Sequence, residues 1–245
     1  MEGRLVFRSE DLDLARCKSE YVQASVDDLV WLGLDWDVGP VFQSKRKSVY
    51  RIYLRRLIEA GFVYPCYCSR KDIAEAASAP HETGDEPIYP GTCREGNIDE
   101  KKMNRKPCWR FRVCDTDTVS FQDKHFGDFV FKPGKDFGDF VIWRQDDIPS
   151  YQLAIVVDDY LMGVTEVVRG EDLLKSTARQ ILIMKALGWK TPAYFHCPLM
   201  LDEKGNRLAK RHKSLSLREI QGQGVDPKEL LKSFKLEAMN WGRAH

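Results

Sequence analysis

The residues of this 245-residue chain with the clearest chemical potential are cysteines in a polar, glycine- and proline-rich stretch. Cys66 and Cys68 are separated by one residue, and Cys93 follows within the same stretch. Thiolates are preferred ligands of zinc, and a structural zinc site needs four donors that loops can bring together. The three cysteines are therefore candidate zinc ligands, although unconnected thiols would give the same spacing. The cysteines alone leave the fourth donor open; the alternatives include His81, Cys108 and Cys114.

A second candidate site follows from the segment between Tyr151 and Gly170. An apolar run, Leu153 to Val157, precedes two aspartates, and a β-branched run then ends at Arg169. We expect a strand, a turn and a second strand, followed by a helix with apolar spacing from Leu174 to Leu187. Open α/β sheets bind ligands at the carboxyl ends of their strands, and a guanidinium can grip a carboxylate through two parallel hydrogen bonds. Arg169 is thus a candidate carboxylate ligand; the alternative is a salt bridge to Glu166 or Glu171.

A third candidate is the basic sequence RLAKR at residues 207–211. Lysine and arginine in a loop can neutralise the charge that develops on phosphates. Taken alone, such a motif is more typical of a solvated surface loop.

The elements expected around these residues are those of an α/β fold. Helices are predicted from Ala15 to Leu32, with an inward stripe that includes Tyr21, and from Ser44 to Ala60, each followed by a glycine. A short strand is expected at Leu5 to Phe7. The sequence FGDFV occurs at 126–130 and 137–141, which favours two adjacent strands. One further helix is expected from Pro227 to Phe234.

The length and composition fit a globular protein of one large α/β domain with an insertion, or of two small domains. The formal net charge is +1, so global basicity gives no indication of nucleic-acid binding. Seven cysteines, an odd number, favour reduced thiols and a cytoplasmic location. No apolar run approaches the ~20 residues that cross a bilayer, and no basic-then-apolar leader follows Met1.

Several blocks occur in the order found in one enzyme family: RSEDLD at 8–13, WLGLDWD at 31–37, YPCYCSRKDI at 64–73, YPGTCR at 89–94 and DFGDFVIWR at 136–144. With RLAKR in the place of the Lys-Met-Ser-Lys-Ser loop, the chain resembles the glutamyl/glutaminyl subgroup of class I aminoacyl-tRNA synthetases. The resemblance is to the small branch that glutamylates queuosine in tRNA(Asp). It implies a Rossmann-like nucleotide-binding core with a zinc-bearing insertion.

The resemblance also implies roles for single residues. Tyr89 becomes the fourth ligand of a structural zinc beside the three cysteines. Glu10 faces the α-ammonium group of glutamate, and Tyr151 and Arg169 line the glutamate pocket. Lys210 is the catalytic residue of the loop. Lys210 and Arg207 together bind ATP, which is a substrate and carries magnesium.

The implied organisation has four parts: the first part of the core (1–61), an acceptor-binding-like insertion (62–148), the second half of the core (149–200), and the basic loop with a C-terminal helical stub (201–245). The family's first strand and its phosphate-binding turn with a His-x-Gly-His-like segment have no counterpart here, so an N-terminally truncated core is expected. The expected partners are L-glutamate, ATP and the anticodon region of tRNA(Asp), with no membrane, and a monomer at full length. A fragment of a discriminating glutamyl-tRNA synthetase, or a non-catalytic paralogue that keeps zinc and RNA contacts, remain alternatives.

Overall fold

The structure is a computed structural model that describes residues 3–13, 17–69, 71–73, 88–96, 98, 100–114, 116, 118–199 and 217–232. The chain forms two compact units. The first comprises residues 1–45 and 197–245, and the second comprises residues 46–196. Among the described residues, no helix combines the length and apolar character that a bilayer crossing requires.

The first unit contains a two-stranded parallel sheet, in which Val6 pairs with Val38 and Ser9 with Phe42. The helix predicted from Ala15 to Leu32 is present from Ser19, but the expected inward stripe is wrong at Tyr21, whose side chain is 56% exposed. Gly33 ends this helix with a φ of 72°, a conformation that glycine adopts without strain. The elements are β1 (Val6–Ser9), α1 (Ser19–Trp31), β2 (Val38–Phe42) and α6 (Leu217–Gly222), and residues 227–232 are also helical.

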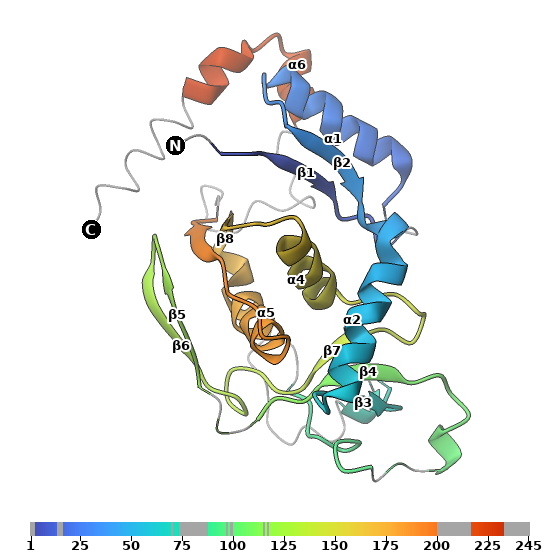
Figure 1. The fold of residues 1–245 in the computed structure, drawn as a ribbon. Helices are drawn as coiled ribbons and strands as arrows, with labels where there is room; N and C mark the ends of the chain where they lie inside the picture. Colours follow the sequence, from blue (N-terminus) through green and yellow to red (C-terminus); the bar gives the residue numbers. More distant parts are fainter. Residues whose placement is uncertain are drawn as a thin grey trace. The chain divides into compact units, whose positions relative to one another are not determined.

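The second unit has two sheets and three long helices (Figure 1). One sheet has the strand order β3-β4-β7 and is antiparallel; the other has the order β6-β5-β9-β8. The strands are β3 (Val63–Cys66), β4 (Cys108–Phe111), β5 (Val119–Asp123), β6 (Gly127–Phe131), β7 (Phe140–Trp143), β8 (Glu166–Gly170) and β9 (Ala193–Cys197). The helices are α2 (Lys47–Glu59), α4 (Tyr151–Leu161) and α5 (Leu174–Ala186), with short 3-10 turns η2 (Glu100–Lys102) and η3 (Glu171–Leu173). The 3-10 turn η1 (Gln43–Arg46) contains the sequence boundary between the two units.

The strand predicted at Leu153 to Val157 is wrong, because this run lies inside α4. Ser150 caps the helix, since its side chain accepts a hydrogen bond from the backbone N–H of Leu153 at 3.4 Å. Residues 152–159 are all buried, and α4 contacts both α2 and α5. A helix that is buried on all sides shows no amphipathic period, so a short apolar run of this kind cannot be told from a strand by its pattern.

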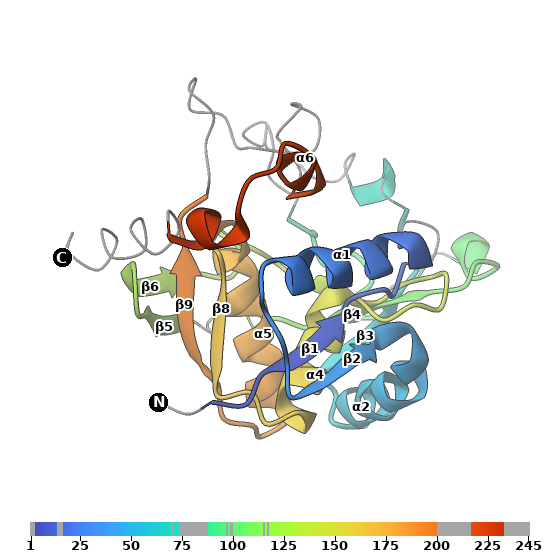
Figure 2. The ribbon, with the colours of Figure 1, turned by 90° about the horizontal axis from the view of Figure 1, so that it is seen from above.

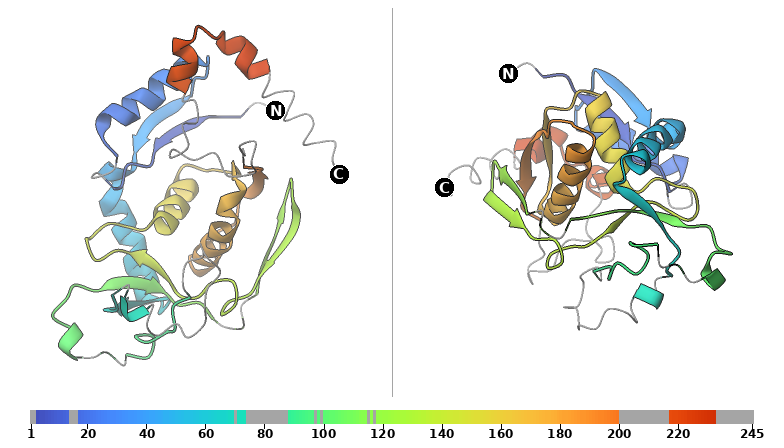
Figure 3. Two further views of the ribbon diagram at one scale, coloured as in Figure 1. Left: turned by 180° about the vertical axis from the view of Figure 1, so that it is seen from behind. Right: turned by 60° about the horizontal axis from the view of Figure 1, so that its bottom comes forward.

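The two FGDFV copies are also not neighbours in one sheet, which corrects the expectation of adjacent strands. The first copy lies in β6, which pairs with β5 as an antiparallel hairpin, and the second contributes Phe140 and Val141 to β7 in the other sheet. Figure 3 shows the β5–β6 hairpin in light green extending alongside α5 in orange. The second half of the segment is as predicted: β8 is a strand that ends at Arg169 and Gly170, and α5 follows it (Figure 2).

Candidate functional site

Three thiols and one phenol meet at the end of β3. The sulfur atoms of Cys66, Cys68 and Cys93 lie within 4.8 Å of one another, and all three residues are buried. The Tyr89 hydroxyl lies 3.4 Å from the Cys66 sulfur and 3.6 Å from the Cys68 sulfur. The structure thus gathers all four residues that the resemblance indicated, from two segments more than twenty residues apart.

Three of the separations between these donor atoms are close to the edge lengths of a zinc tetrahedron. Zn–S bonds of ~2.3 Å and Zn–O bonds of ~2.0 Å at the tetrahedral angle place sulfurs ~3.8 Å apart and sulfur and oxygen ~3.5 Å apart. The Cys68 and Cys93 sulfurs are 3.6 Å apart, and the two sulfur–phenol distances bracket the second value. Within the described part of the chain, this is the one group of three such side chains close enough to hold a metal ion.

A tight turn brings Tyr89 and Cys93 together. Gly91 has a φ of 82°, which a residue with a side chain adopts only with strain. The backbone N–H of Cys93 then donates to the Tyr89 hydroxyl oxygen at 2.8 Å. This bond holds the Tyr89 oxygen in place beside the sulfurs of Cys66 and Cys68.

Arg110 on β4 supplies positive charge to the cluster. Its Nε donates to the Cys66 sulfur at 3.3 Å, and its guanidinium carbon lies 3.9 Å from the centre of the Tyr89 ring. Hydrogen bonding, first with Cys108 and then with Tyr89 and Arg110, lowers the pKa of Cys66 to about 4 although burial opposes its ionisation. Burial raises the pKa of Cys68 to about 12. Without a cation, Cys66 therefore ionises more readily than Cys68, and a bound divalent metal ion would favour the thiolate form of Cys68 as well.

A buried carboxylate anchors the segments that carry these donors. Asp139, in the turn before β7, accepts hydrogen bonds from the Tyr64 hydroxyl at 2.5 Å and from the backbone N–H of Val113 at 2.8 Å. Its two oxygens also accept from Arg94 Nη2 at 2.6 Å and Nε at 2.8 Å. Tyr64 precedes Cys66 by two residues and Arg94 follows Cys93, so Asp139 joins both halves of the cluster. Asp139 lies within the DFGDFVIWR block, but the residue pattern did not predict this anchoring role.

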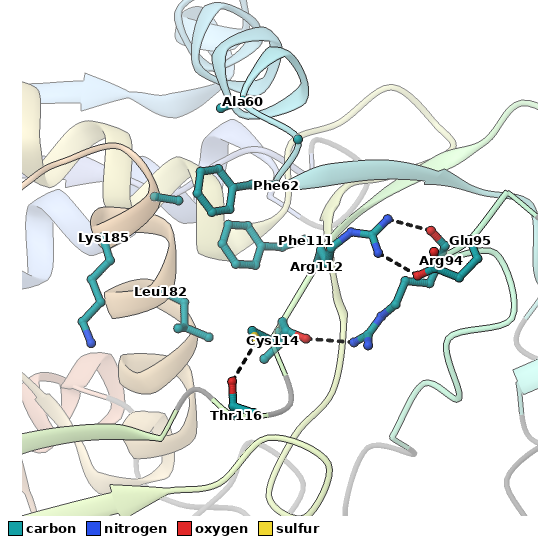
Figure 4. A pocket seen from close by; sticks show the side chains of 13 residues that line it. Ala60, Phe62, Arg94, Glu95, Phe111, Arg112, Cys114, Thr116, Leu182 and Lys185 are labelled. Carbon is teal, nitrogen blue, oxygen red and sulfur yellow. Dashed lines mark hydrogen bonds and ion pairs between the residues drawn. The ribbon is translucent and has the colours of Figure 1, made fainter.

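Of the alternative fourth donors, Cys108 lies beside Cys66, Cys114 lies farther away, and His81 is outside the described residues. The Cys108 thiol donates to the backbone oxygen of Cys66 at 3.4 Å and is not part of the group of mutually close sulfurs. Cys114 is exposed and lines a separate cavity of about 620 Å³ between β4 and the end of α5 (Figure 4). The walls of that cavity include the stacked rings of Phe62 and Phe111, and none of the predicted site residues lines it.

Arg169 occupies the position that the sequence predicted, at the carboxyl end of β8. Its side chain is held by neighbours that the sequence analysis did not identify. Nη2 donates to the Thr177 hydroxyl at 2.5 Å, and Nε donates to Nε2 of His196 at 3.3 Å. The alternative of a salt bridge is not observed, because Arg169 forms no ion pair among the described residues and Glu166 pairs with Lys124 at 2.8 Å.

Tyr151 is the first residue of α4 and is half-buried in the same unit as Arg169. Glu10 belongs to the first unit, where its carboxylate accepts a hydrogen bond from Arg8 at 3.3 Å and is 44% exposed. Arg207 and Lys210 lie outside the described residues. The glutamate-binding roles of Tyr151 and Glu10 and the nucleotide-binding role of the basic loop remain predictions.

Comparison with known proteins identifies the family. Residues 1–244 match the family of class I tRNA synthetases (E and Q), catalytic domain. The chain is 46% identical over 242 residues to a glutamyl-Q tRNA(Asp) synthetase of Symbiobacterium thermophilum, covering 94% of this chain and 74% of the relative. It is 40% identical over 232 residues to a glutamate–tRNA ligase of Aquifex aeolicus, covering 93% of this chain and 49% of the ligase.

A solved structure supports the same assignment. A glutamate tRNA ligase of Elizabethkingia meningosepticum, crystallised in complex with its amino acid, aligns with a TM-score of 0.72 and 25% identity, covering 85% of this chain and 45% of that one. The chain thus spans about half the length of the glutamate–tRNA ligases it matches. From the family match and these identities, the chain belongs to the class I glutamyl/glutaminyl tRNA synthetase catalytic-domain family.

Proposed function

We propose that this chain activates L-glutamate with ATP and transfers the glutamyl group to queuosine in the anticodon region of tRNA(Asp). The observation that carries this proposal is the identity of 43–46% to three proteins named glutamyl-Q tRNA(Asp) synthetase, each matched over 72–74% of its length. In the first step, the glutamate α-carboxylate attacks the α-phosphate of ATP and releases pyrophosphate. In the second, a queuosine hydroxyl attacks the glutamyl-adenylate and releases AMP.

Different residues of this chain are assigned to glutamate binding and to ATP activation. Arg169 grips the side-chain carboxylate of glutamate, with Tyr151 lining the pocket and Glu10 facing the ammonium group. Lys210, supported by Arg207, neutralises charge on the α-phosphate and the leaving pyrophosphate, where magnesium accompanies ATP. The placement of Arg169 at a strand end, with a fixed guanidinium, supports its share of this assignment.

A second candidate function is glutamylation of the acceptor end of a tRNA. The 40% identity to the glutamate–tRNA ligase of Aquifex aeolicus favours this reading. The two candidates share the activation step and differ only in the hydroxyl that accepts glutamate.

We also propose that Cys66, Cys68, Tyr89 and Cys93 hold a structural zinc ion. The close approach of the four donor atoms and the positive charge of Arg110 beside them support it. When bound, the metal joins β3 to the 89–93 turn. Four protein ligands fill its coordination shell, so it takes no part in the reaction itself.

Glutamate-dependent ATP–pyrophosphate exchange tests the activation step. In a catalytically competent form of the protein, exchange should occur with glutamate and not with glutamine or aspartate, in the absence of tRNA. Arg169→Ala should reduce it more than tenfold, because a carboxylate left without its charged partner costs roughly 2–5 kcal/mol. Arg144→Ala is the matched control, since that half-exposed arginine pairs with Asp146 away from the strand end. Absence of exchange would support the non-catalytic alternative, and exchange without a preference for glutamate would refute the assigned amino acid.

Transfer of labelled glutamate separates the two acceptors. Label should appear on tRNA(Asp) that contains queuosine and not on the same tRNA carrying guanosine at that position. Label on tRNA(Glu) would instead assign acceptor-end glutamylation.

Metal content tests the zinc proposal. The purified protein should carry close to one zinc per chain, and Cys93→Ala should lose both metal and thermal stability because metal binding energy is folding energy in such sites. Cys114→Ala, which removes an exposed thiol, is the control. A metal-free protein with the melting temperature of the purified form would remove zinc from this proposal.

A further inference from the structure

A buried chain of hydrogen bonds leads from β5 to Arg169. Asp123, at the end of β5, lies 2.6 Å from Nδ1 of His196 on β9. Nε2 of that ring lies 3.3 Å from Nε of Arg169 and 3.0 Å from the hydroxyl of Thr177 on α5. Asp123, His196 and Thr177 are at most 2% exposed. Figure 2 shows how the chain is assembled: β5, β9 and β8 lie in one sheet, and α5 lies against it.

The network determines which nitrogen of His196 carries the proton. The guanidinium of Arg169 is always protonated, so its Nε–H must donate and the facing Nε2 must accept. The ring proton therefore sits on Nδ1 and is donated to Asp123, which also accepts from the backbone N–H of His196 at 3.1 Å. Asp123 is itself held by the backbone N–H groups of His125 and Phe126, each at 3.0 Å.

The same contacts divide the donors of Arg169 into two sets. Nε–H and the neighbouring hydrogen of Nη2 form one edge of the guanidinium, and this edge is occupied by His196 and Thr177. The end-on edge carries one hydrogen of Nη1 and the second hydrogen of Nη2. No described residue accepts a hydrogen bond from Nη1. Two parallel donors on one edge are the arrangement that recognises a carboxylate bidentately.

We propose that His196, oriented by Asp123, is a positioning residue that fixes one edge of Arg169 and so presents its other edge to the side-chain carboxylate of glutamate. This inference rests on the proposed function. Thr177 completes the support, because its hydroxyl accepts from Arg169 and can donate to the backbone oxygen of Leu173, 3.1 Å away. An arginine fixed in this way loses less conformational entropy when the ligand binds.

Protonation of His196 opposes the arrangement, because Nε2–H would then face the Nε–H of Arg169. Burial lowers the pKa of His196; Arg169 lowers it further, while the Asp123 hydrogen bond and the charge of Asp172 oppose this effect. The uncharged groups that face the ring are Thr177 and the aromatic rings of Phe121 and Tyr194. Glutamate binding should therefore persist below the usual histidine pKa of 6.5 and weaken only at lower pH.

Steady-state exchange kinetics on the full chain test the positioning role. His196→Leu should raise KM for glutamate by roughly tenfold or more, because a buried donor of Arg169 loses its acceptor. KM for ATP and kcat should change far less. His196→Gln keeps an acceptor near the Nε2 position and should recover part of the affinity. His125→Gln is the matched control, since its ring stacks on Phe195 and only its backbone contacts Asp123.

A second measurement does not depend on activity. In protein labelled with ¹⁵N-histidine, the resonance that His196→Gln removes should show a neutral ring with the proton on Nδ1 at pH 7. A proton on Nε2, or a titration at the ordinary pKa, would overturn the network. An unchanged KM for glutamate in both His196 variants, with an active wild-type chain, would overturn the positioning role alone. The expected tautomer in a chain that neither binds nor activates glutamate would refute the proposed function and this inference with it.

Discussion

Replacement of Asp139 by asparagine should cost about 3 kcal/mol of the free energy of unfolding. The side chain is fully buried and accepts hydrogen bonds from Tyr64, Arg94 and the backbone of Val113. Removing one charge of a buried pair costs about 3–5 kcal/mol because the partner is left uncompensated. The lower end applies here, since the Arg94 side chain retains 23% of its exposure to water and can be partly solvated.

The charge makes this contribution dependent on pH. Burial opposes ionisation of Asp139, but the hydrogen bonds from Arg94 and Tyr64 prevail and hold its pKa below the usual 3.8. For a carboxyl group with a lowered pKa, the stabilisation is present above the unfolded-state pKa and is lost as the pH falls through the folded-state pKa. The difference between wild type and Asp139→Asn should therefore be full at pH 7 and shrink below about pH 4.

Urea denaturation of both proteins at matched metal content measures this difference. Asp146→Asn is the control: its pair with Arg144 is about half exposed, so it should cost less than about 1 kcal/mol. Zinc release should also be faster in Asp139→Asn, because Tyr64 and Arg94 adjoin the two halves of the candidate metal site. Equal and small decreases in the free energy of unfolding of the two variants would refute the view that Asp139 organises the segments around Tyr64 and Arg94.

Three further predictions concern other parts of the second unit. Tyr50→Phe should lower the free energy of unfolding by roughly 1.5–3 kcal/mol in denaturant titrations, because it removes a 2.7 Å hydrogen bond to the buried carboxylate of Asp158. A decrease of less than half this size would show that the Asp158 carboxylate is satisfied without the Tyr50 hydroxyl. Gly138→Ala should lower the free energy of unfolding by about 1–3 kcal/mol and weaken zinc binding. The added Cβ would lie 2.8 Å from Cγ2 of Ile88, which precedes Tyr89 of the candidate metal site. Unchanged metal affinity would contradict this coupling. The free energy of unfolding should fall as the pH drops below about 6.5. The pKa of His196 is lowered in the folded state, so the unfolded chain takes up this proton at a higher pH than the folded protein does. His196→Gln should remove this part of the pH dependence.

Local motifs carried most of what could be predicted. The cysteine spacing, with Tyr89 added by the family resemblance, predicted a cluster that the structure brings together, and the tight turn at Gly91 joins two of its members. The strand ending at Arg169 and the helix after it were also correct, since a β-branched run bounded by Gly170 and an amphipathic run ending before Gly188 are signals contained within each segment.

The errors arose where local patterns are ambiguous. The run from Leu153 to Val157 is apolar on every side, so its secondary structure depends on what surrounds it, and α2 and α5 enclose it as a helix. The two FGDFV copies have the same sequence but pair with different strands, because strand partners are chosen by long-range packing rather than by the strand's own residues.

The sequence by itself determined the family, the three thiols with their tyrosine, and the placement of Arg169 at the end of a strand. Only the tertiary structure decided how those groups are held. His196 meets Asp123 across 73 residues and Arg169 across 27, and Asp139 reaches Tyr64 across 75. Such buried polar contacts leave no periodic trace in the chain. Each depends on two distant segments being packed so closely that water is excluded, and only then must every donor find its acceptor.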